Sequence, residues 1–168
     1  VYKRHQSNKE KKVVYEGYDT VPEMIKFSNI KNRNCKIKFS VKDALKVNYK
    51  NSCIVSSFYT LQFISTSKRQ TLVNKIFKGL NWGGAFFLIE KVRGPDARFQ
   101  DYLNQVYVDY KKKKGYSDQE IVSKSLSLKG VLEPFSTKGN IDMLKRAGFK
   151  DVMTIFKYGS FEGFLCIK

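Results

Sequence analysis

The sequence predicts an α/β fold with a mostly parallel β-sheet that ends in an antiparallel hairpin. Residues 53–91 have the order strand, helix, glycine turn and strand, which is typical of a βαβ unit. The expected strand Ala85–Ile89 is apolar at every position, as a strand covered on both faces of a parallel sheet requires. Two strand-like runs at the C-terminus are separated only by Tyr158–Ser160, a turn that favours a hairpin.

The first third of the chain has a strand, helix and strand order of its own. The expected elements are a strand at Val13–Tyr18, a helix from Pro22 to about Asn29, and a strand at Lys36–Ser40. Pro22 fits the first turn of a helix, where its missing N–H is not needed. The polar residues Val1–Lys12 are interpreted as the tail of a preceding helix. An acidic residue closely follows each strand, Asp19 after the first and Asp43 after the second.

The later elements follow from apolar spacing and from capping residues. They are a strand at Cys53–Tyr59, a helix from the Ser65–Ser67 cap to Gly79, a turn at Gly83–Gly84, a strand at Ala85–Ile89, helices at Pro95–Lys114 and Gly139–Ala147, and strands at Asp151–Lys157 and Phe161–Ile167. Helical spacing is clearest in Pro95–Lys114, whose tyrosines we interpret as a core and interface stripe. Ser117 and Glu120 have the spacing of a capping box, which predicts another helix start.

Length and composition favour one folded domain. Residues 1–168 are expected to form a single domain, which at this size buries roughly 70% of the surface of the unfolded chain. The longest purely apolar run, Ala85–Ile89, is too short to span a membrane, and no signal peptide is recognised. We therefore expect a globular protein with no membrane partner.

Cysteine and histidine usage argues against a metal centre. Cys35, Cys53 and Cys166 lie far apart in strand-like segments, so we expect buried reduced thiols and a cytoplasmic protein. His5 is the only histidine, and no two cysteines have the Cys-x-x-Cys spacing. We therefore expect no metal, and no catalysis that depends on histidine.

The net charge of +17 is compatible with a nucleic acid or another anionic partner. An alternative interpretation is that lysine occupies solvated surface positions, because only six of the 32 basic residues are arginine. Lys111–Lys114 end an expected helix, where cations suit the negative end of the helix dipole. No aromatic RNA-binding motif accompanies this run, so the charge alone identifies no partner.

Asp19 and Asp43 are the first candidate ligand-binding residues. In open α/β sheets ligands lie beyond the carboxyl ends of the strands, and a carboxylate there can accept hydrogen bonds from the hydroxyls of a ribose. Asp19 stands at such a strand end, and Asp43 is placed to accept a hydrogen bond from an adenine amino group. The alternative is that both residues only cap turns or helices. Glu90, at the end of another strand, is interpreted as a turn carboxylate in preference to a catalytic one.

An ordered set of motifs resembles the carboxy-S-adenosyl-L-methionine synthase family, which has the Rossmann-like class I S-adenosylmethionine-dependent methyltransferase fold. The motifs are Tyr18–Ile25, Thr60–Phe63, Arg69-Gln70, Lys75–Ala85, Glu90-Lys91, Gly115–Ile121 and Ala147–Phe149. The family pattern matches the chain without a gap from Asp43 to the C-terminus, about three-quarters of its length. The whole set in order is far more specific than its glycine motif alone.

The resemblance implies a ligand, a reaction and partners. The implied cofactor is S-adenosyl-L-methionine or carboxy-S-adenosyl-L-methionine, with Asp19 and Thr20 at the ribose, and with Asp43 and the backbone of Ala44 at the adenine. The family joins a carboxyl group derived from prephenate to the methyl group of S-adenosyl-L-methionine. The implied protein is a cytoplasmic homodimer whose product serves modification of the tRNA wobble uridine. No catalytic residue is assigned.

The chain departs from the family at three places. Phe58 occupies the position of a family asparagine at the cofactor, and Ser125 occupies the position of the arginine expected to bind the transferred carboxylate. Serine cannot offer the charged, bidentate contact of arginine. The first strand of the sheet and its glycine-rich loop are missing before Val1, so we expect an N-terminally incomplete domain of a larger protein.

These departures leave two alternatives open. One is an ordinary S-adenosylmethionine-dependent methyltransferase that acts on a small molecule or on RNA, because methyl transfer asks mainly for positioning by the protein. The other is a catalytically inactive, basic module that binds tRNA or a protein partner.

Overall fold

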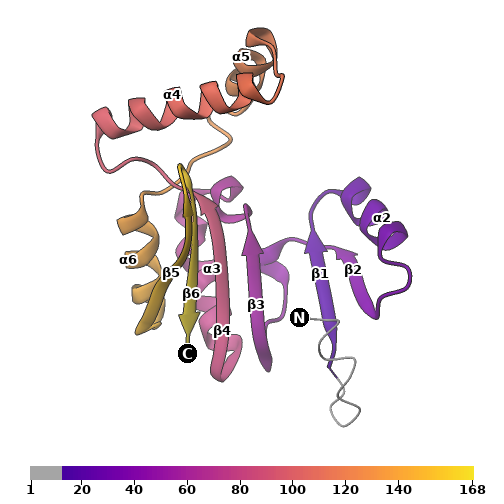
Figure 1. Ribbon diagram of the computed structural model, residues 1–168. Coiled ribbons are helices and arrows are strands. Elements are labelled where there is room, and N and C mark those ends of the chain that lie inside the picture. Colours follow the sequence, from indigo (N-terminus) through magenta and orange to yellow (C-terminus); the bar gives the residue numbers. More distant parts are fainter. Residues whose placement is uncertain (1–12) are drawn as a thin grey trace. The chain divides into compact units, whose positions relative to one another are not determined.

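The computed structural model describes residues 13–168 (Figure 1). These residues form two compact units, and the boundary between the units along the chain falls between Asn48 and Tyr49. Each unit has a β-sheet of its own. The helix tail predicted at Val1–Lys12, and His5 within it, lie outside the described residues. The prediction that the whole chain forms one domain stays a prediction.

The first unit has a βαβ arrangement. Its elements are strand β1 (Tyr15–Asp19), helix α2 (Pro22–Lys31) and strand β2 (Ile37–Val41), followed by a short 3-10 turn, η1 (Ala44–Lys46). The two strands pair in parallel, with Tyr15 opposite Ile37. Pro22 begins the helix as predicted, because its fixed φ suits the first helical turn.

The second unit contains a mixed four-stranded sheet. Its strands are β3 (Ser52–Phe58), β4 (Leu80–Lys91), β5 (Asp151–Tyr158) and β6 (Phe161–Ile167), in the order β3-β4-β6-β5. Strands β3 and β4 are parallel, whereas β6 is antiparallel to both β4 and β5. The predicted α/β fold with a C-terminal antiparallel hairpin is confirmed.

Two helices, α3 (Thr66–Gly79) and α6 (Thr137–Ala147), cover one face of this sheet (Figure 1). Fully buried apolar side chains form the core of the unit: Leu72, Val73 and Ile76 of α3, Phe86 and Leu88 of β4, Met143 and Leu144 of α6, and Phe149 and Phe164. Burying one such side chain contributes about 1.5–3 kcal/mol. The apolar residues that recur at helical spacing in α3 therefore face the core.

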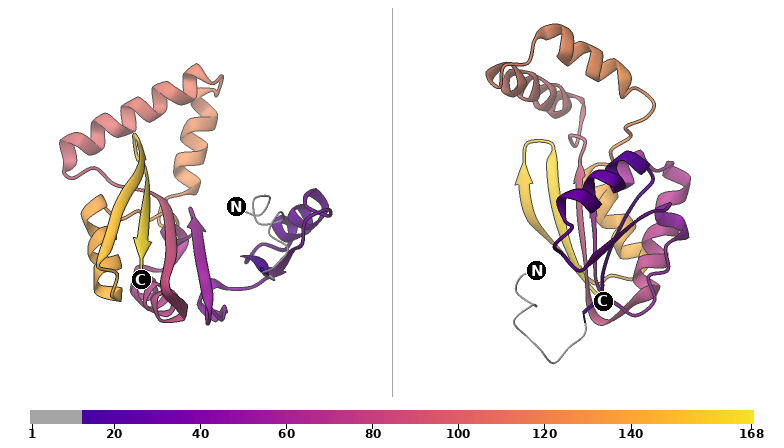
Figure 2. Two further views of the ribbon diagram at one scale, coloured as in Figure 1. Left: turned by 60° about the horizontal axis from the view of Figure 1, so that its bottom comes forward. Right: turned by 90° about the vertical axis from the view of Figure 1, so that its right-hand side faces the viewer.

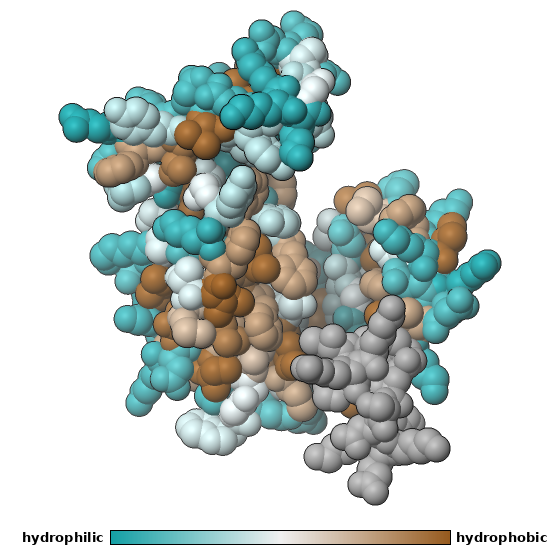
Figure 3. Space-filling model, in the orientation of Figure 1, coloured by the Kyte–Doolittle hydropathy of each residue, from teal (hydrophilic) through white to brown (hydrophobic). Residues whose placement is uncertain are grey.

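The opposite face of the sheet is more open, and apolar side chains gather on it in the second unit (Figure 3). Successive residues of a strand point to opposite faces. In β4, Phe86 is buried, whereas Phe87 and Ile89 point the other way and are half-buried. In β3, Ile54 is opposite Ala85, which shares the face of Phe87, and Phe58 is opposite Ile89; Ile54 and Phe58 are 50% and 55% exposed. We call this the open face of the sheet.

Helices α4 (Ala97–Lys113) and α5 (Asp118–Ser127) lie beyond the carboxyl ends of β3 and β4 (Figures 1 and 2). Asp96 caps α4 by accepting a 3.0 Å hydrogen bond from the N–H of Phe99. Ser117 and Glu120 form the predicted capping box of α5. The predicted capping box is therefore confirmed, whereas the Asp96 cap was not predicted.

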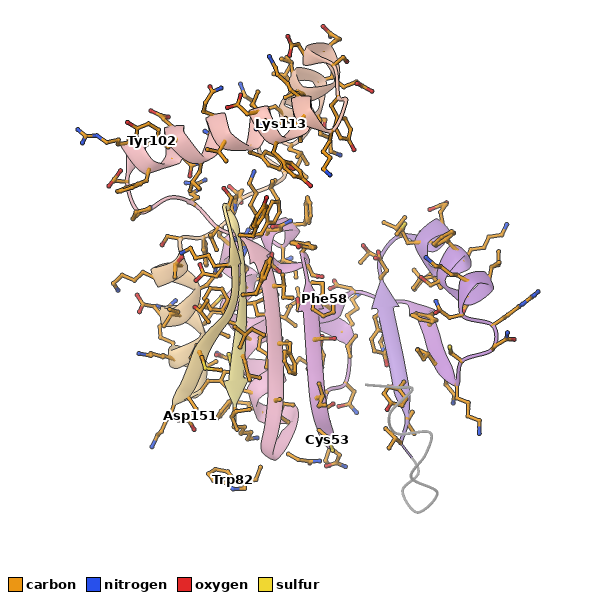
Figure 4. The ribbon with its side chains drawn as sticks, in the orientation of Figure 1. Cys53, Phe58, Trp82, Tyr102, Lys113 and Asp151 are labelled. Carbon is orange, nitrogen blue, oxygen red and sulfur yellow. The ribbon has the colours of Figure 1, made fainter. Side chains whose placement is uncertain are left out.

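The tyrosines of α4 are less buried than predicted. No residue of this helix, Ala97–Lys113, is buried, and Tyr102 is 63% exposed (Figure 4). Tyr110 is also exposed, whereas Tyr107 is half-buried. The core part of the predicted core and interface stripe was wrong because no second layer within residues 13–168 covers the outer side of α4, and the interface part stays a prediction. No helix within residues 13–168 is long and apolar enough to cross a membrane.

Two predictions at the other end of the sheet were also wrong. Gly83 and Gly84 do not form a separate turn but lie inside β4, where the register jumps from Leu80 opposite Ser52 to Ala85 opposite Ile54. Such a bulge suits Gly83, whose φ of +73° is rare for other residues. Cys53 is exposed at this end (Figure 4) and Cys35 of the first unit is only half-buried, so buried thiols were predicted correctly for Cys166 alone.

Candidate functional site

Four of the six candidate residues lie in the first unit, at one edge of its two-stranded sheet. Asp19 ends β1, and Asp43 follows the end of β2 by two residues. The backbone N–H of Lys42 donates a 2.9 Å hydrogen bond to the carbonyl oxygen of Asp19, which joins the two strand ends. Thr20 and Ala44 directly follow the two acids. The parallel pairing therefore brings these four residues to the edge where such sheets bind ligands.

Both acids also hold the backbone that follows them. Asp19 Oδ1 accepts a 2.9 Å hydrogen bond from the N–H of Val21, just before α2. Asp43 Oδ1 accepts a 2.8 Å bond from the N–H of Leu45 and caps η1. Within residues 13–168, no hydrogen bond to Oδ2 of either acid is formed. A capping role is thus observed, and one oxygen of each carboxylate can still accept from a ligand.

Phe58 and Ser125 lie on separate elements of the second unit. Phe58 is the last residue of β3 and lies on the open face, opposite Ile89 (Figure 4). Tyr59, which follows it, has a φ of +54° that is uncommon outside glycine, and its N–H donates a 2.7 Å bond to the carbonyl of Ile89. Ser125 is exposed on α5. No hydrogen bond joins Phe58 and Ser125 within the described residues.

The buried carboxylate of Glu90 holds the turn that follows β3. It lies near the end of β4 and accepts backbone hydrogen bonds from Thr60, Leu61 and Gln62 at 3.0, 2.9 and 3.0 Å. Burial raises the pKa of Glu90 to about 7, although the three backbone donors lower it. These bonds confirm the interpretation of Glu90 as a turn carboxylate.

Arg69 fixes the same turn from the other side. Its guanidinium donates to three backbone carbonyls, those of Ile64 at 2.8 Å, Glu133 at 2.6 Å and Gln62 at 3.2 Å. Arg69 is almost fully buried, and burial lowers its pKa from the ordinary value. Sequence reasoning gave Arg69 no role, although it stands in one of the recognised motifs. It ties the turn after β3 to the segment between α5 and α6.

Two lysines share one tyrosine ring at the carboxyl end of the sheet, and we call this group the lysine–tyrosine cluster (Lys91, Lys111 and Tyr107). The Nζ atoms of Lys91 and Lys111 lie 5.1 and 4.6 Å from the centroid of the Tyr107 ring. Tyr107 also packs against Phe161 at 5.9 Å, and Phe161 against Tyr59 at 5.8 Å. Ammonium groups at these distances are attracted by the face of the ring.

Sequence reasoning missed the lysine–tyrosine cluster. Lys91 belongs to a recognised motif, and the spacing from Tyr107 to Lys111 is one helical turn, so two partial signals were present. Only the fold brings Lys91 of β4 against α4. Within residues 13–168 no group of three or more histidine, cysteine or acidic side chains is placed to hold a metal ion. The carboxylates of the first unit can accept hydrogen bonds from ligand hydroxyls, and the ammonium groups of the second unit can attract anions.

The chain resembles known enzymes closely in sequence, although no protein-family model matches it. Carboxy-S-adenosyl-L-methionine synthase of Campylobacter curvus is 40% identical over 158 residues, which cover 93% of this chain and 68% of that protein. The enzyme of the same name from Staphylococcus epidermidis is 39% identical over 132 residues, 79% of this chain and 58% of that protein. The chain thus spans between about half and two thirds of the length of such relatives.

Solved structures show the same fold. Human N-acetylserotonin methyltransferase in complex with S-adenosylmethionine matches 92% of this chain and 40% of its own, with a TM-score of 0.62 and 17% identity. A protein of Bordetella parapertussis, described as a possible exported protein, matches 93% of this chain and 53% of its own, with a TM-score of 0.66 and 16% identity. The fold is therefore the Rossmann-like fold of S-adenosylmethionine-dependent methyltransferases.

Proposed function

Because the chain belongs to the carboxy-S-adenosyl-L-methionine synthase family, we propose that its protein is a transferase that joins a carboxyl group to the methyl group of S-adenosyl-L-methionine. The observation that carries this proposal is the 40% identity with the Campylobacter curvus enzyme along 93% of the chain. The methyltransferase fold supports it, because that fold binds a nucleoside cofactor at the carboxyl ends of its strands.

We propose that the first unit holds the nucleoside part of the cofactor. Asp19 would accept the ribose hydroxyls beside Thr20, and Asp43 with the backbone of Ala44 would contact the adenine. The arrangement fits this ligand because both acids lie at one sheet edge and their Oδ2 atoms make no hydrogen bond within residues 13–168. Asp19 is exposed and Asp43 is half-buried, so a ligand can reach both.

The bound cofactor would supply an activated methyl carbon, and the residues of this chain would mainly bind and orient it. Phe58 would contribute an apolar surface at the end of β3, and the turn after it is held by Glu90 and Arg69. Such fixing of a turn at a ligand site favours catalysis because less motion is lost on binding. No residue is assigned to proton transfer.

Ser125 favours a second candidate function, that of an ordinary methyltransferase. A family member with serine at this position lacks the arginine that would bind the transferred carboxylate, and Ser125 is exposed on α5. Lys124 is adjacent and charged, but a lysine is not equivalent to a bidentate arginine. Methyl transfer to a small molecule or to RNA does not require a carboxylate-binding arginine. An inactive basic binding module is the remaining alternative.

We also propose a cytoplasmic homodimer whose product serves tRNA wobble-uridine modification. An apolar stripe on α4 supports the dimer, because these side chains lie one helical turn apart and are 42–63% exposed: Phe99, Tyr102, Val106 and Tyr110. The charge of +17 is compatible with contact to tRNA.

Native mass spectrometry of the purified protein tests the proposed function. Bound carboxy-S-adenosyl-L-methionine would support the carboxyl-transfer activity in spite of Ser125. Bound S-adenosyl-L-methionine or its demethylated product alone would instead favour an ordinary methyltransferase. A protein that carries no ligand, and takes up none of these when they are added, would favour the binding module and contradict both enzymatic proposals.

A further inference from the structure

The lysine–tyrosine cluster brings two ammonium groups to one aromatic ring. Lys91 and Lys111 are both half-buried, and both ammonium groups lie within 5.1 Å of the Tyr107 ring centroid. Within residues 13–168, neither lysine forms a salt bridge with an acidic side chain. Other lysines of the same unit do: Lys112 with Asp118, Lys138 with Asp142, and Lys157 with Glu162.

This lack of an acidic partner has an electrostatic cost. Burial lowers the pKa of Lys91, and the nearby charge of Lys111 lowers it further. Two close ammonium groups repel each other, and a partly buried one is also poorly solvated. The aromatic ring offsets a part of this cost only. A bound anion between or beside the two lysines would remove the repulsion, so the pair favours anion binding.

The cluster lies on the open face next to Phe58. In the sheet, Phe58 is opposite Ile89, and Lys91 follows Ile89 by two residues, so Lys91 points to the same face. Lys91 is also opposite Phe161 in β6, and Phe161 contacts Tyr107. The two lysines therefore stand beside Phe58, a position that the resemblance places at the cofactor.

We propose that Lys91 and Lys111, supported by Tyr107, form a carboxylate-binding site that takes the place of the arginine replaced by Ser125. This inference rests on the proposed function, because it assigns the site to a carboxylate involved in the same transfer. The occupant is either the carboxyl group of the carboxylated cofactor or that of a small organic carboxylate which donates it. Ammonium groups recognise both by the same charge-assisted hydrogen bonds.

The test compares two ligand pairs that differ in charge. Calorimetry measures the affinity of the purified protein for carboxy-S-adenosyl-L-methionine against S-adenosyl-L-methionine, and for phenylacetate against phenylacetamide. The variants are Lys91→Gln and Lys111→Gln, with Lys91→Arg to test whether a cation restores binding. Lys113→Gln is the matched control, since Lys113 is an exposed lysine of the same helix (Figure 4). Thermal unfolding verifies that each variant is folded.

We expect Lys91→Gln and Lys111→Gln to lower the preference for the carboxylate ligand tenfold or more in at least one of the two ligand pairs. We expect Lys91→Arg to retain this preference. A loss in the cofactor ratio would place the carboxylated cofactor at the cluster, and a loss in the phenylacetate ratio would place a free carboxylate there. Ratios that stay within twofold of those of Lys113→Gln would overturn the proposal. Failure of the proposed function is distinct: the unmodified protein would then bind S-adenosyl-L-methionine alone or neither cofactor, while the phenylacetate pair would still test the lysines.

Discussion

Glu90 Oε1 accepts a 2.9 Å hydrogen bond from the backbone N–H of Leu61, so the end of β4 holds the turn that follows β3. The same carboxylate accepts from Thr60 and Gln62. One buried side chain therefore satisfies three backbone donors that would otherwise lack partners. Phe58 and the open face of the sheet lie directly before this turn.

Glu90→Gln should destabilise the protein. In the variant, an NH₂ group replaces one of the two carboxylate oxygens that accept hydrogen bonds from the turn. This NH₂ group would then face a backbone N–H, and two donors cannot form a hydrogen bond with each other. Leaving one buried donor without an acceptor costs about 1–3 kcal/mol. Urea unfolding measures the loss, and Glu133→Gln, at an exposed glutamate, is the control. Equal unfolding midpoints for the two variants would contradict the role of Glu90 in holding the turn.

The stability of the protein should depend on pH through Glu90. Its pKa is about 7 in the folded protein against an ordinary value of 4.5, so the folded state binds more protons between these values. The contribution of Glu90 to the free energy of unfolding is therefore complete below about pH 4.5 and is lost as the pH rises through 7. Unfolding measured from pH 4 to 8 should show a smaller decline in Glu90→Gln. Parallel curves would exclude Glu90 as the cause.

Lys91→Met should raise stability at neutral pH while it weakens carboxylate binding. Burial lowers the pKa of Lys91, which means that the folded state disfavours its charge. Between the lowered pKa of Lys91 and the ordinary value of 10.5, the unfolded state binds more protons than the folded state, so the unmodified protein gains stability as the pH rises. The difference in stability between Lys91→Met and the unmodified protein should therefore become smaller in this pH range. Thermal unfolding at pH 7 and pH 10 measures this, with Lys113→Met as control. A less stable Lys91→Met protein at pH 7 would show that packing or the tyrosine contact outweighs desolvation.

Asp19→Ala should weaken the binding of S-adenosyl-L-methionine at least tenfold, which is about 1.4 kcal/mol. Asp19 also accepts from the N–H of Val21, so Asp19→Asn is the matched variant that keeps this acceptor. We expect Asp19→Asn to unfold like the unmodified protein and to bind with intermediate affinity. Unchanged affinity in Asp19→Ala, measured by calorimetry, would sink the assignment of this residue to the ribose.

Ser125→Arg should increase the preference for carboxy-S-adenosyl-L-methionine over S-adenosyl-L-methionine, because it restores a bidentate cation at this position. Ser123→Arg adds the same charge to the same helix, and residues two apart on a helix do not share a face. Competition binding with both cofactors measures the ratio. The same ratio in both variants would mean that residue 125 does not meet the transferred group.

Gly148→Ala should destabilise the protein more than Gly115→Ala. Both glycines follow helices with positive φ, +118° at Gly148 and +88° at Gly115, and a side chain there costs roughly 1–2 kcal/mol. A Cβ at Gly148 would also lie 2.5 Å from the Phe77 ring, whereas none of the described atoms lies within 4 Å at Gly115. Denaturant unfolding compares the two. Similar losses would show that the Phe77 ring moves away at little cost.

The local elements were predictable where the signal is short-range. The Ser117–Glu120 capping box and the start of α2 at Pro22 depend on a few adjacent residues, and both are confirmed. The Gly83–Gly84 turn was predicted wrongly, because a bulge and a turn have similar sequences and the pairing with β3 decides between them. The predicted burial of the α4 tyrosines was wrong for a similar reason, because the exposure of a helical residue depends on whether another layer covers the helix.

The sequence by itself determined the α/β order of elements, the family, and the acids at the strand ends, because periodicity, caps and motifs are written in consecutive residues. The tertiary structure alone decided which distant groups meet. Lys91 and Lys111 lie 20 positions apart in the sequence, yet they share the ring of Tyr107. Glu90 reaches a turn about 30 residues earlier for the same reason. Burial and electrostatic coupling arise from packing, and packing between strands and helices cannot be derived from residue spacing along one element.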